Sequence, residues 1–215
     1  MLLTAASAFG ANRVREVGGY PELPFPKAGC PNDCQAIGRV TGYQVQVGSA
    51  RNPYLVHRPG KVVAFTIRLG KPDAEQTTFF ANLFGGQPQA RLTILKKPKR
   101  DKPKTNDLRV VAQSELVDLE DYMGSSPTFA LSKPLKVPDE SIIALTVPTW
   151  APAFTINLGN DQAWRSARDP DDCGGTSQVA QQTVGGVHGY DCFYRTARLL
   201  YSATFIPDPR KTKKG

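Results

Sequence analysis

The chain has little of the material from which catalytic and metal sites are commonly built. Its 215 residues include only two histidines, His57 and His188. No Gly-x-Ser-x-Gly segment is present, so the sequence signature of a nucleophile elbow is missing. His57 lies in a proline-flanked loop and His188 in a glycine-rich segment, and neither position alone indicates a catalytic base. The scarcity of histidine also argues against a zinc site built on the cysteines.

Long hydrophobic runs are missing too. No segment approaches the roughly 20 apolar residues that a helix needs to cross a bilayer, so we expect no membrane span. Residues 1–11 are small and apolar, end in Ala-x-Ala-like triplets and contain no basic residue. We interpret them as the rear part of a truncated signal peptide. An apolar terminus without a targeting role is the alternative.

Basic residues outnumber acidic ones by 27 to 19, which gives a net charge of +8. The surplus lies in two places, residues 96–104 and residues 210–214, and the rest of the chain is close to neutral. A nucleic-acid-binding protein spreads positive charge over one face and intersperses aromatic residues for stacking. The pattern here is typical of a solvated loop and a solvated terminus, with weak attraction to an anionic polymer at most. We therefore expect no specific nucleic acid partner.

The four cysteines form two close pairs, Cys30 with Cys34 and Cys173 with Cys192. An even number of paired cysteines without histidine partners indicates disulfides and an oxidising compartment. Four cysteines allow three pairings, and we favour the two local ones because each closes a short loop at small entropic cost. Four reduced thiols in a cytosolic protein are the alternative. The cysteines thus predict a secreted or cell-surface protein.

Alternating apolar and polar residues predict strands along much of the chain. The clearest is residues 61–69, in which Val63, Phe65, Ile67 and Leu69 are expected to face a core. We predict further strands in segments 37–47, 91–95, 108–113, 114–119, 128–131, 141–147, 155–158 and 198–206. The second and third of these are expected to pair as a hairpin with the basic loop at its tip.

Residues 73–84 predict the one helix. Asp73 and Gln76 have the spacing of an N-terminal capping box, and a Gly-Gly pair follows the segment as a stop signal. Its apolar stripe consists of Phe79, Phe80, Leu83 and Phe84. We expect this stripe to pack on the sheet.

About eight to ten short strands with turn residues between them and one helix predict a mainly β, antiparallel β-sandwich of the jelly-roll-like kind. The domain would span residues 30–208. Residues 12–29 are expected to form an extended Pro/Gly-rich lead-in, and residues 209–215 a basic tail. Residues 159–192 are predicted to be a long irregular excursion closed by the second cysteine pair.

Three segments carry a resemblance to known proteins: residues 34–45 (CQAIGRVTGYQV), 84–91 (FGGQPQAR) and 144–153 (ALTVPTWAPA). They are similar to segments of uncharacterised secreted proteins of actinobacteria, and the likeness covers residues 30–206. The resemblance implies export and a β fold. It implies no activity, cofactor or site residue.

Two acidic clusters supply the paired carboxylates that a glycoside hydrolase would need. The first consists of Glu115, Asp118, Glu120 and Asp121, and the second of Asp169, Asp171 and Asp172. The first is typical of the solvent face of a strand and the second of a loop, and neither is flanked by an aromatic-rich strand. A secreted carboxylate-dependent hydrolase is therefore our alternative interpretation.

Calcium is the metal ion that the sequence suits best, because calcium takes oxygen ligands from loops without a fixed spacing. No EF-hand pattern is present. The candidate ligands lie near one another in the excursion: Asn160, Asp161, Asp169, Asp171 and Asp172. No organic cofactor is expected.

Aromatic and basic residues in and beside the excursion are the best candidates for ligand binding. They are Trp150, Trp164, Arg165, Arg168, Tyr190 and Tyr194. Exposed aromatic rings with polar neighbours stack on sugars or anchor protein partners; the alternative is that Trp150 plugs the end of the sandwich and Trp164 pins the loop. We expect a secreted, non-enzymatic sandwich that binds a cell-surface polysaccharide, another polymer or a protein through residues 150–194. A purely structural envelope protein is a further alternative.

Overall fold

The structure, a computed structural model, describes residues 14–19, 24–99 and 104–209. Outside the described residues lie the predicted signal segment 1–11, residues 100–103 of the basic loop and residues 210–215 of the predicted tail. Within the described part, strands dominate and α1 (Ala74–Phe84) is the one α-helix. Neither α1 nor the two short 3-10 helices, η1 (Glu120–Tyr122) and η2 (Pro170–Asp172), are long and apolar enough to cross a membrane.

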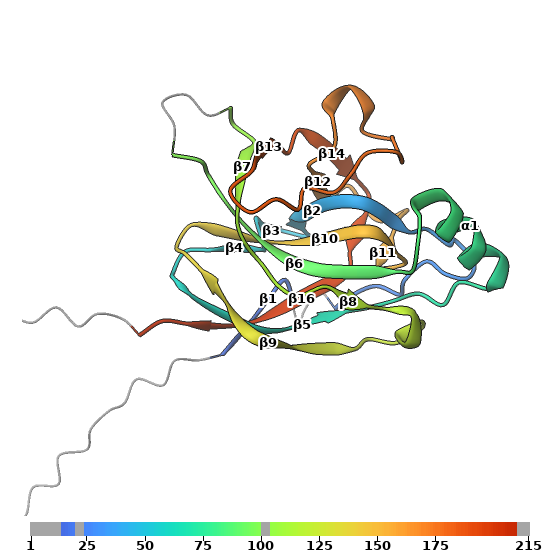
Figure 1. Ribbon diagram of the computed structural model, residues 1–215, viewed down its shortest axis with the longest axis horizontal. Coiled ribbons are helices and arrows are strands. Elements are labelled where there is room, and N and C mark those ends of the chain that lie inside the picture. Colours follow the sequence, from blue (N-terminus) through green and yellow to red (C-terminus); the bar gives the residue numbers. More distant parts are fainter. Residues whose placement is uncertain (1–13, 20–23, 100–103, 210–215) are drawn as a thin grey trace, which may run out of the picture.

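Two large antiparallel sheets make up most of the architecture, and a two-stranded sheet completes it (Figure 1). The smaller sheet has the order β1 (Arg15–Val17), β16 (Tyr201–Pro207), β5 (Gly60–Ile67) and β9 (Thr128–Val137). The larger sheet has the order β13 (Val187–Gly189), β7 (Asp107–Gln113), β6 (Gln89–Lys96), β10 (Ser141–Ala151), β2 (Ile37–Val47), β12 (Gln162–Ser166) and β14 (Cys192–Arg195). Short strands attach to it, β3 (Ala50–Arg51) to β2, β4 (Leu55–Val56) to β10 and β8 (Val117–Asp118) to β6, while β11 (Phe154–Thr155) pairs with β15 (Arg198–Leu199).

The main core lies between the two sheets. Phe65 and Ile67 of the smaller sheet are fully buried against Leu92 and Ile94 of the larger one, and Tyr201 fills the space between them. Burying such side chains stabilises a fold by about 1.5–3 kcal/mol each. The predicted mainly β, antiparallel sandwich with one helix is confirmed, as is the hairpin of β6 and β7.

Strand β5 differs at one residue from the alternation predicted for residues 61–69. Val62 is fully buried and Val63 is half-buried, although we expected Val63 to face the core. In the pairing with β16, β5 advances two residues from Ala64 to Val62 while β16 advances one. Val63 is thus the extra residue of a β-bulge, which interrupts the two-residue period. The predictions for Phe65, two residues further on, and for the rest of the strand are confirmed.

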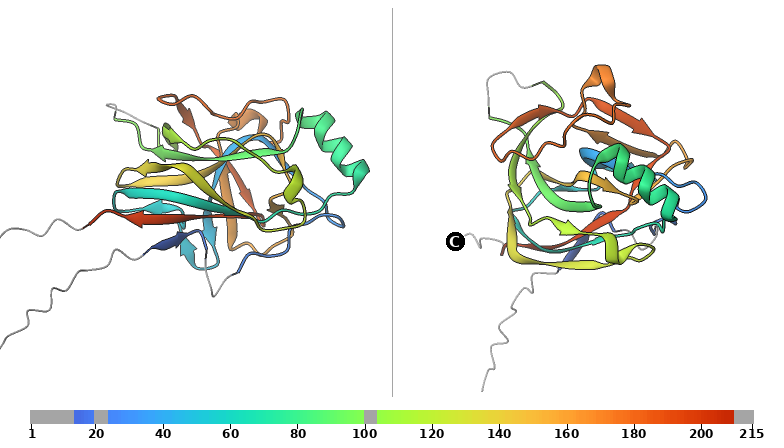
Figure 2. Two further views of the ribbon diagram at one scale, coloured as in Figure 1. Left: turned by 60° about the horizontal axis from the view of Figure 1, so that its bottom comes forward. Right: turned by 45° about the vertical axis from the view of Figure 1, so that its right-hand side comes forward.

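Helix α1 begins and ends as predicted and lies across one end of the sandwich (Figure 2). The capping box is present: the backbone N–H of Gln76 donates to Asp73 Oδ1 at 2.8 Å, and the backbone N–H of Asp73 donates to Gln76 Oε1 at 3.0 Å. Of the predicted apolar stripe, only Phe80 and Phe84 are buried. The other two side chains remain accessible, because α1 meets the end of the sheet along one edge only.

Residues 159–192 are more regular than predicted. They contain β12, η2 and β13, and β12 pairs with β2 on one side and β14 on the other. The excursion folds over the outer face of the larger sheet, where Tyr190, Tyr43 and Leu108 belong to a second buried cluster. Residues 15–17 of the predicted lead-in also form an element, because β1 pairs with β16 at the sheet edge. The strands in these two segments escaped prediction because each has only three to five residues and lacks a clear alternation of apolar and polar residues.

Candidate functional site

Both predicted cysteine pairs, Cys30–Cys34 and Cys173–Cys192, are joined as disulfides. The second bridge ties the end of η2 to β14. It is supported by the Tyr194 hydroxyl, which donates to the Cys173 carbonyl at 2.6 Å. The excursion is therefore fixed to the sheet at this point both covalently and by hydrogen bonding.

Three of the residues predicted to bind a ligand lie in the interior. Trp150 and Tyr190 are 0% exposed and Trp164 is 3% exposed. Trp150 packs on Phe80 with ring centroids 5.4 Å apart and donates its indole N–H to the Gly86 carbonyl. The expectation of an exposed aromatic platform is thus corrected for these three residues, because their rings are covered by protein and have no face left for a ligand.

The other three predicted residues are half-buried and bonded to the excursion. The ring of Tyr194 stacks on Trp164 at a centroid distance of 4.2 Å. Arg165 donates to the backbone carbonyls of residues 190 and 191 and lies over the Phe193 ring at 4.9 Å. Arg168 donates to the carbonyls of Gly38 and Cys173 at 3.0 and 3.1 Å. Arg168 also lines a surface groove.

This groove, of about 710 Å³, runs between α1 and the excursion. Phe79 and Leu83 of α1 form one wall, and Arg168 and Thr176 form the other. Residues 34–36 also line it. Phe79 is 59% exposed and Leu83 is 37% exposed, so the α1 wall of the groove offers apolar side chains to a ligand. We call this feature the α1 groove.

Both disulfides border the α1 groove. Cys34 lines it, and its side chain packs against the cluster of Phe80, Phe84 and Trp150. The Gln76 amide donates to the Pro31 carbonyl at 2.8 Å, which ties the first turn of α1 to the Cys30–Cys34 loop. On the other wall, Arg168 is held by the carbonyl of Cys173. Covalent bonds thus brace the groove from both sides.

Charge in the α1 groove is mainly negative. Asp73 and Glu75, both exposed, lie on the α1 side, and Arg168 is the basic side chain among the lining residues. Asp169 and Asp171 follow Arg168 in the chain and are exposed as well. Sequence reasoning recognised the stripe containing Phe79 and Leu83 but assigned it to the core; no sequence signal pointed to Thr176.

The predicted calcium ligands are not brought into one cluster. Among the described residues, no group of three or more His, Cys, Asp or Glu side chains is placed to hold a metal ion. Asp169 caps η2 by accepting the backbone N–H of Asp171 at 3.0 Å, and Asp172 accepts the Gln178 amide at 3.1 Å. Asn160 and Asp161 lie in the turn before β12.

The other acidic cluster has structural roles. Glu115 accepts the backbone N–H of Ser132 on β9 at 2.6 Å, and Asp118 accepts the Gln89 amide at 2.7 Å. Burial alone would raise the pKa of Glu115, but the hydrogen bonds from Ser132 and from the Glu115 backbone together outweigh it and lower the pKa. Glu115 is therefore ionised near neutral pH, which does not suit a general acid. Glu120 and Asp121 belong to η1.

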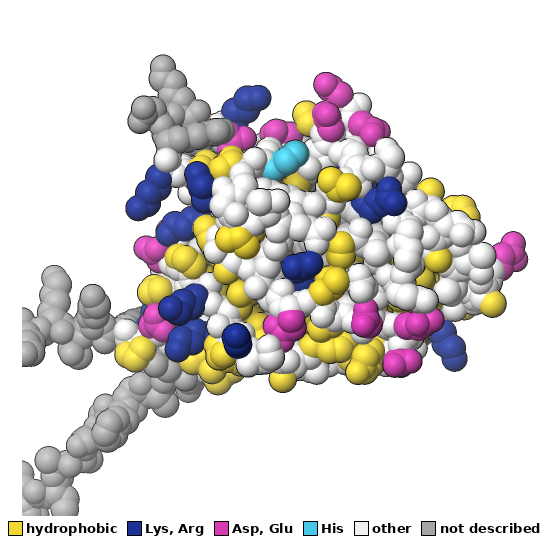
Figure 3. Space-filling view, in the orientation of Figure 1, with side chains coloured by type: hydrophobic (Ala, Val, Ile, Leu, Met, Phe, Trp, Pro, Cys, Tyr) yellow, Lys and Arg dark blue, Asp and Glu magenta, His cyan; other side chains and the backbone are white. Residues whose placement is uncertain are grey.

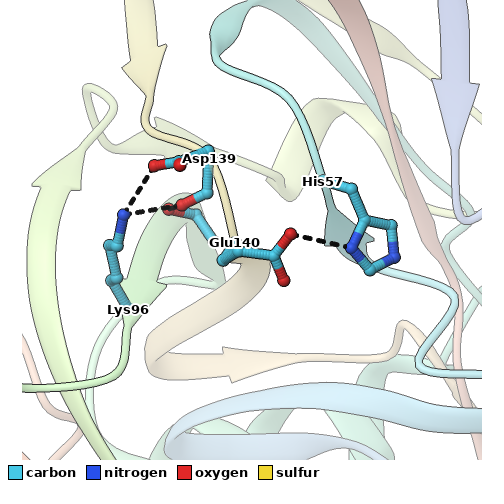
Figure 4. A network of polar contacts seen from close by, with 5 residues as sticks. His57, Lys96, Asp139 and Glu140 are labelled. Carbon is cyan, nitrogen blue, oxygen red and sulfur yellow. Dashed lines mark hydrogen bonds and ion pairs between the residues drawn. The ribbon is translucent and has the colours of Figure 1, made fainter.

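The two histidines lie at the surface and apart from both clusters. His57 Nδ1 lies 3.0 Å from Glu140 Oε1, next to the pair of Lys96 and Asp139 (Figure 4). The His188 ring contacts the carbonyl of the residue that follows it at 2.9 Å. The first contact joins the segments that precede β5 and β10, and the second stays within β13.

The chain matches no family model, no curated protein and no solved structure. The resemblance to secreted actinobacterial proteins therefore stays a prediction.

Proposed function

We propose that the protein is an exported, non-enzymatic β-sandwich domain that binds a protein partner through the α1 groove. One observation carries the proposal: Phe79 and Leu83 remain 59% and 37% exposed in a groove braced by two disulfides. Neighbouring large apolar side chains on a concave surface are typical of interaction sites.

The lining chemistry favours a protein segment over a polysaccharide. Sugars stack best on the flat rings of Trp and Tyr, whereas a phenylalanine beside a leucine suits apolar side chains. Asp73 and Glu75 make the α1 wall acidic. The partner that fits best is therefore a segment with apolar anchors flanked by Lys or Arg, since complementary charge selects the partner and speeds its association.

The bracing of the groove supports a binding role. A site that is rigid before it binds loses less conformational entropy on association. The Cys30–Cys34 bridge restrains the segment next to α1, and the Cys173–Cys192 bridge restrains the Arg168 wall. The same bridges support the proposal of export, since disulfides persist in oxidising compartments.

The hydrolase alternative has no specific support. Glu115 is held ionised by Ser132, and Asp169 and Asp172 accept hydrogen bonds that stabilise their own loop. A catalytic pair would need one carboxyl group with a raised pKa.

Panning a phage-displayed random peptide library over the immobilised protein tests the proposal. We expect enrichment of peptides with two apolar residues flanked by Lys or Arg. The double variant Phe79→Ser/Leu83→Ser should weaken the binding of a selected peptide at least tenfold, since each lost anchor contributes about 1–2 kcal/mol.

The matched control is Val179→Ser/Val184→Ser, which replaces two exposed apolar residues outside the groove and should leave binding unchanged. Both double variants should unfold at the same urea concentration as the wild type, because all four side chains are exposed. An enriched peptide that binds both double variants equally well would refute the groove as the site. Retention on an insoluble polysaccharide that is lost only in the Phe79/Leu83 variant would refute a protein partner.

A further inference from the structure

A second cavity lies at the opposite end of the larger sheet from α1. Its volume is about 410 Å³, within the range of small-molecule sites. Its walls come from β2, the β3–β4 segment, the base of the β6–β7 hairpin and the turn that leads into β10. We call it the hairpin cavity. It shares no lining residue with the α1 groove.

One side of the hairpin cavity is apolar. Tyr43, Leu55, Leu108 and Ile142 line it, and Tyr43 is 7% exposed. The Tyr43 ring is held by packing on Tyr190 at a centroid distance of 5.7 Å. Half-buried Leu55 and Ile142, together with the small part of Tyr43 that stays accessible, match the C–H face of a sugar ring.

The other side carries polar groups held by partners of their own. Asn106 donates its amide to Asp191 Oδ1 at 2.7 Å, which fixes the orientation of its side chain and leaves its amide oxygen as an acceptor. Glu140 is held by His57 through one carboxylate oxygen (Figure 4). Asn52 completes the set. Amide and carboxylate groups at fixed positions are the usual partners of sugar hydroxyls.

The entrance of the hairpin cavity is positively charged. Lys97 lines it and donates to the Thr105 carbonyl, and the exposed Lys99 and Lys104 belong to the same hairpin. Asp139 is paired with Lys96 at 2.8 Å and interacts more weakly with Lys99. Several Lys and Arg side chains gather at this end of the molecule in Figure 3. Such a field attracts an anionic ligand.

We propose that the hairpin cavity binds one saccharide unit that carries a carboxylate or a phosphate group. The sugar ring lies against Tyr43 and its apolar neighbours, and its hydroxyls bond to Asn52, Asn106 and Glu140. The anionic group faces Lys97. This site is independent of the α1 groove, so either can fail without the other.

The protonation state of the Tyr43 phenol suits binding rather than catalysis. Burial raises its pKa to about 12; the nearby Arg165 opposes the rise and Asp191 adds to it. The phenol is therefore neutral at physiological pH, and it can donate a hydrogen bond but cannot act as a base.

Calorimetric titration of the full chain with glucuronate, glucose 6-phosphate and glucose, at about 50 mM salt, tests the inference. We expect millimolar or tighter binding of at least one anionic sugar and at least tenfold weaker binding of glucose. Binding of glucuronate alone identifies the carboxylate as the preferred anion, and binding of glucose 6-phosphate alone identifies the phosphate. Equal affinity for glucose and the anionic sugars, or no binding of any of the three, would overturn the proposal.

Two lysine variants distinguish an ion pair with Lys97 from the attraction exerted by the net charge of the protein. Lys97→Gln should weaken the anionic sugar about fivefold to tenfold, since it removes one partly desolvated ion pair, and should leave glucose unaffected. Lys133→Gln makes the same change on β9, outside the cavity, and should alter affinity less than twofold. Equal losses in the two variants would show that net charge rather than Lys97 is responsible, and would contradict the assigned site.

Discussion

Removal of the Cys173–Cys192 disulfide measures how far the Arg168 wall depends on its covalent brace. The bridge joins cysteines 19 positions apart, and the loop-entropy relation assigns it about 3.2 kcal/mol. Cys30–Cys34 spans 4 positions, for which the same relation gives about 1.9 kcal/mol. The double variant Cys173→Ala/Cys192→Ala should therefore lose about 1.4 kcal/mol more than Cys30→Ala/Cys34→Ala.

Burial adds to this difference. Cys192 is 1% exposed, so its replacement by Ala also removes a buried sulfur, which costs roughly 1 kcal/mol more. The other three cysteines are only half-buried. The total difference between the two double variants should thus approach about 2.4 kcal/mol.

Urea unfolding followed by tryptophan fluorescence is the assay. Trp150 and Trp164 are both buried, so unfolding should shift their emission to longer wavelength. The Cys173/Cys192 variant should also bind groove peptides more weakly than wild type, because its Arg168 wall is freed. A larger loss of stability in the Cys30/Cys34 variant, or unchanged stability in both, would refute the reasoning.

Three further predictions concern stability. Trp150→Ala should lower the free energy of unfolding by about 3–5 kcal/mol in urea, because the fully buried ring packs on Phe80; a loss under 1 kcal/mol would contradict its role at the end of the sandwich. Gly38→Ala should lower the urea midpoint, because a Cβ there would lie 2.3 Å from the Phe84 ring; an unchanged midpoint would contradict that packing. Burial raises the pKa of Tyr43 from 10.0 to about 12. The neutral Tyr43 phenol should therefore contribute fully to the free energy of unfolding below pH 10, and this contribution, roughly 2–3 kcal/mol, should be lost as the pH rises to about 12. In Tyr43→Phe, which has no phenol to ionise, that part of the loss should be missing from the pH dependence of urea unfolding.

Sequence pattern predicted the elements that depend on local interactions. The capping box of Asp73 and Gln76 located α1 because both hydrogen bonds form within four residues. Strands β6, β7 and β16 alternate or run apolar for long enough to be recognised. Strand β12 was missed because its position between β2 and β14 depends on partners far away in sequence. The bulge at Val63 was missed for the same reason, since its partner strand lies about 140 residues further on.

The candidate sites were harder to predict than the fold. The sequence places Trp150 just before the excursion and Trp164 within it, but it does not show that both rings turn inward. The same ambiguity applies to Phe79, because a helical stripe does not reveal how much of its width the sheet will cover. The hairpin cavity joins residues from four separate segments, and only the tertiary fold brings them together.

The central claim is that the excursion is fixed by an oxidised cysteine pair in a protein matured outside the reducing cytosol. Mass spectrometry of chymotryptic peptides, from protein alkylated at harvest from its native host, tests this directly because Tyr190 lies between Cys173 and Cys192. We predict a linked pair of peptides holding these two cysteines, with no alkylation at either. Alkylated thiols at both positions would contradict the claim.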